Sequence, residues 1–157
     1  MVGRKPKPTE LKIVGGNAGR RPLPENEPEP QAVVGQPPIP NWLEDNERAA
    51  VLWPEFVREL QAMRVLTTAD LHALALLCSA YAAYQAHTAT IADEGTTYTS
   101  VTEKGEITRP HPEVAMASDA YRRAQGMLVE FGMTPSSRTR VKAAKKPEAA
   151  DPLGEFV

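Results

Sequence analysis

The chain has 157 residues, 41% hydrophobic and 6% aromatic, with a net charge of −2, which suits one small domain with an aliphatic core. Its lone cysteine, Cys78, excludes an intrachain disulfide and a cysteine zinc site, and the lack of a long apolar run excludes a transmembrane helix. No apolar region follows the N-terminal cations as a signal peptide requires, so we expect a soluble cytoplasmic protein.

The charge is divided unevenly along the chain. Residues 1–21 carry six Lys or Arg and one Glu, and residues 138–146 carry five Lys or Arg and no acid. Residues 22–137 carry seven basic and 16 acidic residues, a balance of −9. An acidic body flanked by these two basic segments indicates a polyanionic partner that the segments contact.

Residues 1–40 are predicted to form an extended, largely disordered arm. Nine of the 15 prolines lie in this stretch, and proline removes backbone donors and blocks helix continuation. We therefore expect the first packed residue to be Trp42, at the start of a helical oligomerisation core over residues 41–137.

The first helix is expected to begin near Asn41 to Asp45, where Asn and Asp can cap its N-terminus. Apolar residues then recur at four-residue steps, at Leu52, Phe56 and Leu60. Because Pro54 lies inside this pattern, we expect a kink or two abutting helical pieces there.

The second helix is predicted over residues 68–94, with Thr67 and Asp70 as a capping box and Gly95 at its end. Apolar side chains lie on nearly all of its sides, so it must be covered on nearly all sides. The chain has few other elements to provide this cover, which suggests contacts between subunits. The residues that we assign to a subunit interface are Leu71, Leu74, Leu77, Cys78, Tyr81 and Tyr84.

The chain then changes character. Residues 96–109 are rich in Thr, Tyr, Val and Ile around "EKGE", which predicts a short β-hairpin. A third helix is expected over residues 113–131 and ends at Gly132. Thr134 can cap a short basic helix or turn that begins at Pro135. We expect residues 138–157 to be a flexible tail, basic and then acidic. The expected fold class is therefore mainly α, with about three helices and one hairpin between disordered basic ends.

The sequence offers no catalytic or metal constellation. Its three histidines include no pair at the four-residue spacing that lets two side chains share a metal on a helix. The glycine-rich "VGGNAG" lacks the Lys and Ser or Thr of a phosphate-binding loop. We expect surface or core histidines, no cofactor, and no enzymatic activity.

The two basic segments are candidate contacts for duplex DNA, because cations that lie along a phosphate backbone gain by releasing counterions. Aromatic residues that would stack on single strands are not interleaved with them, so the contact should be largely indifferent to sequence. The alternative is that the segments only solubilise the protein. The candidate DNA-binding residues are Arg4, Lys5, Lys7, Lys12, Arg20, Arg21, Arg138, Arg140, Lys142, Lys145 and Lys146.

A helix-turn-helix is discounted. Residues 71–92 contain no Arg or Lys, whereas a recognition helix presents polar and basic side chains to the base edges.

Several segments, in order, resemble the small terminase subunits of tailed double-stranded DNA bacteriophages. They are "GRKPKP" (3–8), "GNAGRRP" (16–22), "PPIPNWL" (37–43), "LTTADLHALALLCSAYAAY" (66–84) and "FGMTPSSRTR" (131–140). The resemblance implies a non-enzymatic factor in the host cell cytoplasm that forms a ring of about eight to twelve subunits. Such a ring binds concatemeric viral DNA and delivers it to the large terminase subunit, which holds the ATPase and nuclease. "PSSRTR" could contact DNA or simply cap the third helix.

Two other functions stay open. The chain could be a DNA-binding regulatory protein of low oligomeric state. It could also be a structural or head-completion protein whose basic segments serve solubility. The oligomeric state distinguishes the regulatory protein from a ring-forming packaging factor. Binding to duplex DNA distinguishes the structural protein from that factor.

Overall fold

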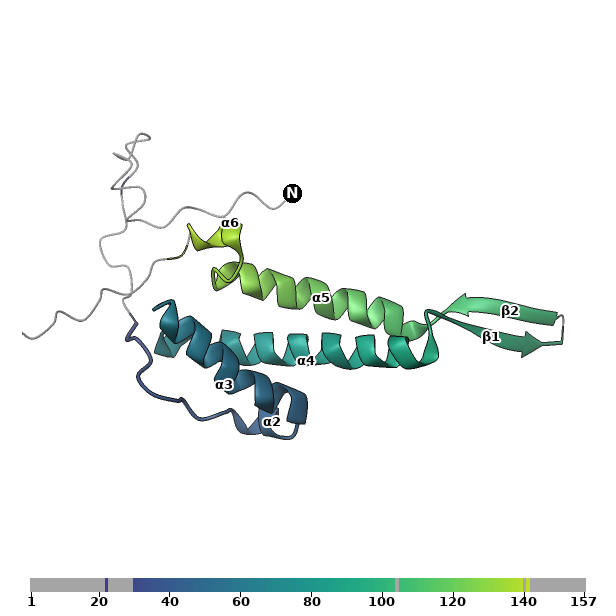
Figure 1. The fold of residues 1–157 in the computed structure, drawn as a ribbon, viewed down its shortest axis with the longest axis horizontal. Coiled ribbons are helices and arrows are strands. Elements are labelled where there is room, and N and C mark those ends of the chain that lie inside the picture. The colour runs from purple at the N-terminus through teal and green to yellow at the C-terminus, as the bar shows by residue number, and fades with distance from the viewer. Residues whose placement is uncertain (1–21, 23–29, 104, 140, 142–157) are drawn as a thin grey trace, which may run out of the picture.

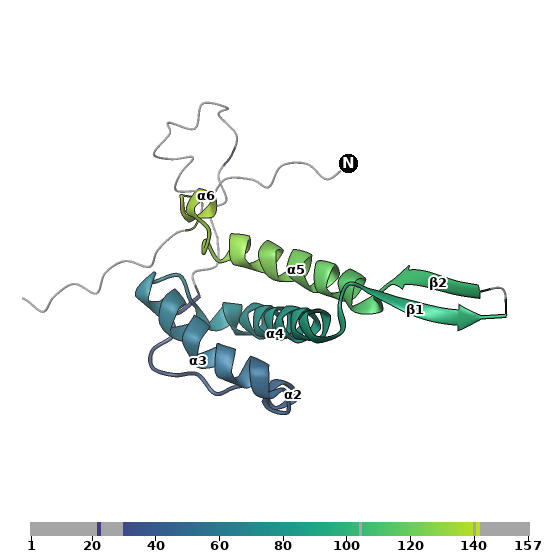
Figure 2. The same cartoon turned by 45° about the vertical axis from the view of Figure 1, so that its right-hand side comes forward.

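The computed structural model describes residues 22, 30–103, 105–139 and 141. The described elements are α2 (Asn41–Glu44), α3 (Glu47–Ala62), the 3-10 turn η1 (Thr68–Asp70), α4 (Leu71–Glu94), β1 (Thr97–Thr102), β2 (Gly105–Pro110), α5 (Pro112–Glu130) and α6 (Pro135–Arg138). Helices α4 and α5 lie antiparallel along each other, and α3 packs beside the N-terminal half of α4 (Figures 1 and 2). The predicted fold class, mainly helical with one hairpin, is confirmed.

The helical core lies where α3, α4 and α5 meet. Buried residues of α4 all fall between Leu74 and Ala82, and none of residues 83–94 is buried. From α3 the core takes Ala49, Leu52, Trp53, Phe56, Val57 and Leu60, and from α5 the small residues Ala117, Ala120 and Ala124. One chain therefore covers the first half of α4 and leaves its second half with much less cover.

Helix α3 runs through Pro54 as a single element, so the predicted division into two pieces at that residue is wrong. Pro54 is exposed, so its ring takes no room in the core, and the hydrogen bond that the helix lacks is the one to the Ala50 carbonyl four residues earlier. The break between helical pieces lies earlier, at Asp45 and Asn46, where the Asn46 side chain accepts a hydrogen bond from the Ala49 N–H at 3.1 Å.

The entry into α4 follows the predicted capping box. The Asp70 carboxylate accepts hydrogen bonds from the Thr67 N–H at 3.0 Å and from the Thr67 hydroxyl at 2.5 Å. These bonds fix the 3-10 turn η1, from which α4 continues to Glu94. Gly95 ends α4 with a φ of 90°, a value that favours glycine.

An extended segment before α2 packs on the helical core, so packing begins before the expected first residue. Pro37 is buried, and its carbonyl accepts a hydrogen bond from the Trp53 indole N–H at 3.0 Å. The Gln61 amide donates to the carbonyls of Gly35 at 2.5 Å and Val33 at 3.3 Å. By contrast, Trp42 is 55% exposed, and the prediction that it is the first packed residue is wrong.

The hairpin extends past the ends of the helices (Figures 1 and 2). Strands β1 and β2 pair antiparallel, with Thr97 opposite Pro110 and Thr102 opposite Gly105. Every position of β2 is exposed, and β1 is half-buried at Ser100 and Thr102 alone. The hairpin thus has the predicted position but adds nothing to the helical core.

The turn after α5 requires glycine at position 132. Gly132 has a φ of 71°, and a Cβ built there would lie 2.6 Å from the Val141 Cγ2 atom. Gly126 lies inside α5, and a Cβ there would meet nothing within 4 Å. The two glycines therefore differ in what an alanine would cost.

We expect Gly132→Ala to lower the free energy of unfolding by about 1–3 kcal/mol, through a strained backbone and overlap with Val141. Gly126→Ala should instead raise it by about 0.5–1 kcal/mol, because alanine favours a helix interior. Urea unfolding followed by circular dichroism measures both. Equal effects of the two substitutions would contradict the described turn.

Candidate nucleic-acid and subunit interfaces

Arg138 is the candidate DNA-binding residue that lies within the described part of the chain. It is exposed and is the last residue of α6. The buried Ser137 before it donates its hydroxyl to the Thr134 carbonyl at 3.0 Å and accepts from the Thr134 N–H at 3.2 Å. "TPSS" thus builds α6 itself and does not cap α5, while the Arg138 side chain remains in solvent.

Most of the candidate cations lie outside the described residues. These are Arg4, Lys5, Lys7, Lys12, Arg20, Arg21, Arg140, Lys142, Lys145 and Lys146. The residues that the structure describes hold seven Arg and 13 Asp or Glu, a balance of −6. Two of these arginines, Arg122 and Arg123, lie at 3.6 Å and 2.9 Å from the Asp119 carboxylate. The described body is therefore acidic, and most of the candidate cations lie in the basic segments outside it.

The predicted subunit-interface residues fall into two groups. Leu74, Leu77 and Cys78 are fully buried within one chain, so they belong to its own core and offer a neighbour no surface. Burial raises the pKa of the Cys78 thiol to about 12, which keeps it protonated at neutral pH. Leu71, Tyr81 and Tyr84 are half-buried, so part of each side chain remains open to a partner.

The half-buried tyrosines belong to a row of rings across three helices. Ring centroids are 5.7 Å apart for Phe56 and Tyr81, 6.4 Å for Tyr81 and Tyr84, and 5.7 Å for Tyr84 and Tyr121. The row begins in the core at Phe56 and ends at Tyr121, which is 49% exposed. The sequence pattern shows only that Tyr121 shares the apolar face of its helix, so it did not predict an interface at this residue.

Two further apolar residues of the long helices are exposed. Leu76 on α4 is 53% exposed and Met116 on α5 is 49% exposed. Their spacing does not reveal this exposure, since both lie in apolar helices whose cover depends on which neighbours pack against them.

Two histidine–carboxylate pairs hold the base of the hairpin. His87 Nδ1 pairs with the Glu113 carboxylate, and His111 Nε2 lies 3.0 Å from Glu94 Oε2. His111 Nδ1 also accepts from the Glu113 N–H at 3.3 Å, which assigns the proton to Nε2 and makes it the donor to Glu94. The backbone N–H of His111 donates to the Thr96 carbonyl at 2.8 Å. The end of α4, the start of α5 and the hairpin are thereby joined.

The pairing of His87 and His111 with carboxylates was not predicted, because the partners are 26 and 17 residues apart along the chain. Within the described ranges, no group of His, Cys, Asp and Glu side chains could hold a metal ion. None of the helices described is long and apolar enough to cross a membrane.

Comparison with known proteins adds a family. A family model described as phage terminase, small subunit, matches residues 49–148, which is more than half of the chain. The match begins in α3, includes the hairpin and both long helices, and continues into the C-terminal basic segment. No curated protein and no solved structure matches the chain.

Proposed function

Because the chain belongs to the phage terminase small subunit family, we propose that it is a ring-forming, non-enzymatic adaptor that brings viral DNA to the large terminase subunit. The family implies a role in DNA packaging, with the large subunit and DNA as partners. The match over residues 49–148 is the observation that carries the proposal.

Duplex binding is assigned to the two basic segments. The described body has a balance of −6, so it repels a phosphate backbone, whereas residues 1–21 have a balance of +5 and residues 138–146 also have +5. Arg138 lies at the edge of the body, where the C-terminal basic segment begins. Several subunits in one assembly would add their weak phosphate contacts into useful avidity.

Assembly is assigned to the open apolar surface of α4 and α5. Leu71, Tyr81 and Tyr84 of the predicted interface remain in the proposal, joined by Tyr121 and Leu76. Tyrosine is enriched at the centres of protein interfaces, because it supplies a large contact area with little loss of side-chain entropy. A cyclic arrangement lets each subunit use one face for the subunit before it and another for the subunit after it.

The test is the mass of the native assembly, measured by native mass spectrometry and light scattering. We expect one closed oligomer of about eight to twelve subunits that binds duplex DNA at low salt. A monomer or dimer that binds duplex would favour the regulatory protein. An oligomer that ignores duplex at low salt would favour the structural protein with solubilising segments.

A further inference from the structure

The hairpin is exposed to solvent along both strands, and contacts at its base fix its orientation. No residue described in β1 or β2 is buried, and Val101 is 78% exposed. A two-stranded hairpin alone is marginally stable in water. Its base, however, is fixed by His111 through the bonds to Glu94 and Thr96, and the Tyr98 and His111 ring centroids lie 6.1 Å apart. The hairpin is therefore presented as a projecting element in a defined orientation.

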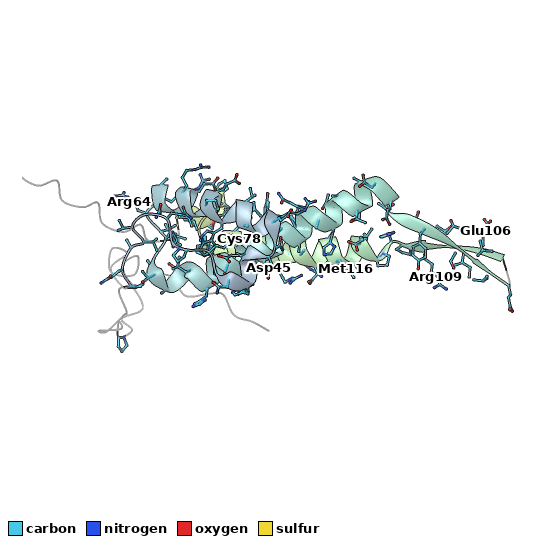
Figure 3. All side chains as sticks on the ribbon, turned by 90° about the horizontal axis from the view of Figure 1, so that it is seen from below. Asp45, Arg64, Cys78, Glu106, Arg109 and Met116 are labelled. Carbon is cyan, nitrogen blue, oxygen red and sulfur yellow. The ribbon has the colours of Figure 1, made fainter. Side chains whose placement is uncertain are left out.

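Strand β1 has an open edge that lacks the usual protection. Proteins protect exposed edge strands with charged residues, especially Lys, or with Pro. The sequence of β1, "TYTSVT", contains none of these and is rich in residues that favour strands. Strand β2 differs, because it carries Glu106 and Arg109, whose side chains point out from the hairpin in Figure 3. An unprotected edge of this kind can accept hydrogen bonds from, and donate them to, a further strand.

We propose that β1 of each subunit pairs with β2 of the next subunit, so that the hairpins form one continuous sheet around the ring. This inference rests on the proposed ring. Cyclic symmetry relates neighbours by the same rotation, so the β1 side of one hairpin faces the β2 side of the next. Because β1 and β2 are antiparallel within a hairpin, β1 and the neighbouring β2 are antiparallel as well. The sheet closes on itself, and no edge remains open.

Charge and size both agree with this pairing. A seam between β1 and β2 places Glu106 and Arg109 beside an uncharged strand, so no like charges oppose each other across it. A two-stranded ribbon is about 10 Å wide, whereas a pair of packed helices is about 20 Å wide. The hairpins therefore fit around a smaller circle than the helices and lie closer to the ring axis.

Cysteine cross-linking between copies tests the seam. Thr99→Cys on β1 and Thr108→Cys on β2 change exposed residues, and the buried, protonated Cys78 should not react in the native protein. The two variants, with different tags, are co-expressed and treated with a short bismaleimide. Its span of about 8–10 Å tolerates a shift of one residue pair in register.

We expect cross-linked dimers that contain both tags, since about a quarter of the seams in a random mixture bring the two cysteines together. Either variant alone should give essentially no dimer. Dimers from Thr99→Cys alone would show β1 against β1 and overturn the proposal. As a matched control, Thr99→Cys combined with Ser118→Cys, an exposed position on α5, should not cross-link.

Native mass spectrometry of the same variants distinguishes a failure of the proposed ring from a failure of the proposed strand pairing. If the protein is not oligomeric, the proposed ring fails and the strand pairing fails with it. If a closed oligomer forms without dimers that carry both tags, the strand pairing alone is wrong.

Discussion

Replacement of the six cations of residues 1–21 by glutamine should lower the affinity for duplex DNA by at least about 100-fold at low salt. Each phosphate contact contributes about 0.9 to the slope of log affinity against log salt, so the slope should fall by up to about 5. The substitutions are Arg4→Gln, Lys5→Gln, Lys7→Gln, Lys12→Gln, Arg20→Gln and Arg21→Gln. Fluorescence anisotropy with a labelled duplex at several salt concentrations measures both quantities.

The matched control removes cations from the body. Arg122→Gln with Arg123→Gln changes two exposed side chains that already lie near Asp119, so the affinity and its salt dependence should change little. Light scattering should show the same oligomer for both variants, because neither set belongs to the proposed subunit interface. Unchanged binding by the variant without the six cations would show that residues 1–21 serve solubility.

Leu77→Ala should lower the free energy of unfolding by about 2–5 kcal/mol, because it removes a fully buried side chain and leaves a cavity in the core. Leu76→Ala, at the adjacent and half-exposed position on α4, should cost less than about 1 kcal/mol in protomer stability. Urea unfolding measures the difference, with all variants at one protomer concentration because assembly shifts apparent stability.

The two substitutions distinguish an apolar residue of α4 that belongs to the core of one chain from one that is open to a neighbouring subunit. Leu77 was assigned to a subunit interface from the sequence, and the structure places it inside one chain. Leu76→Ala should lower the fraction of assembled protein in light scattering, while the free energy of unfolding of the protomer changes little. An equal loss of folding stability at both positions would contradict the described burial of α4.

Features that depend on residues close together in the sequence were predicted well. The Thr67 and Asp70 capping box, the end of α4 at Gly95 and the hairpin between the long helices all appear in the structure. Each depends on residues within a few positions, such as a side chain that satisfies a free N–H or a glycine with positive φ. Pro54 is the exception, because α3 continues through it as one helix although proline removes a hydrogen bond from a helix interior.

The sequence by itself therefore determined the type and order of the elements, the separation of acidic body from basic segments, and the motifs that resemble the terminase family. Only the tertiary structure decided which side of α4 is covered, that the Trp53 indole donates to the Pro37 carbonyl, and that His87 and His111 hold the base of the hairpin. The physical reason is distance along the chain. These contacts join residues 16 to 26 positions apart, and periodicity shows that a helix face is apolar without showing which surface covers it.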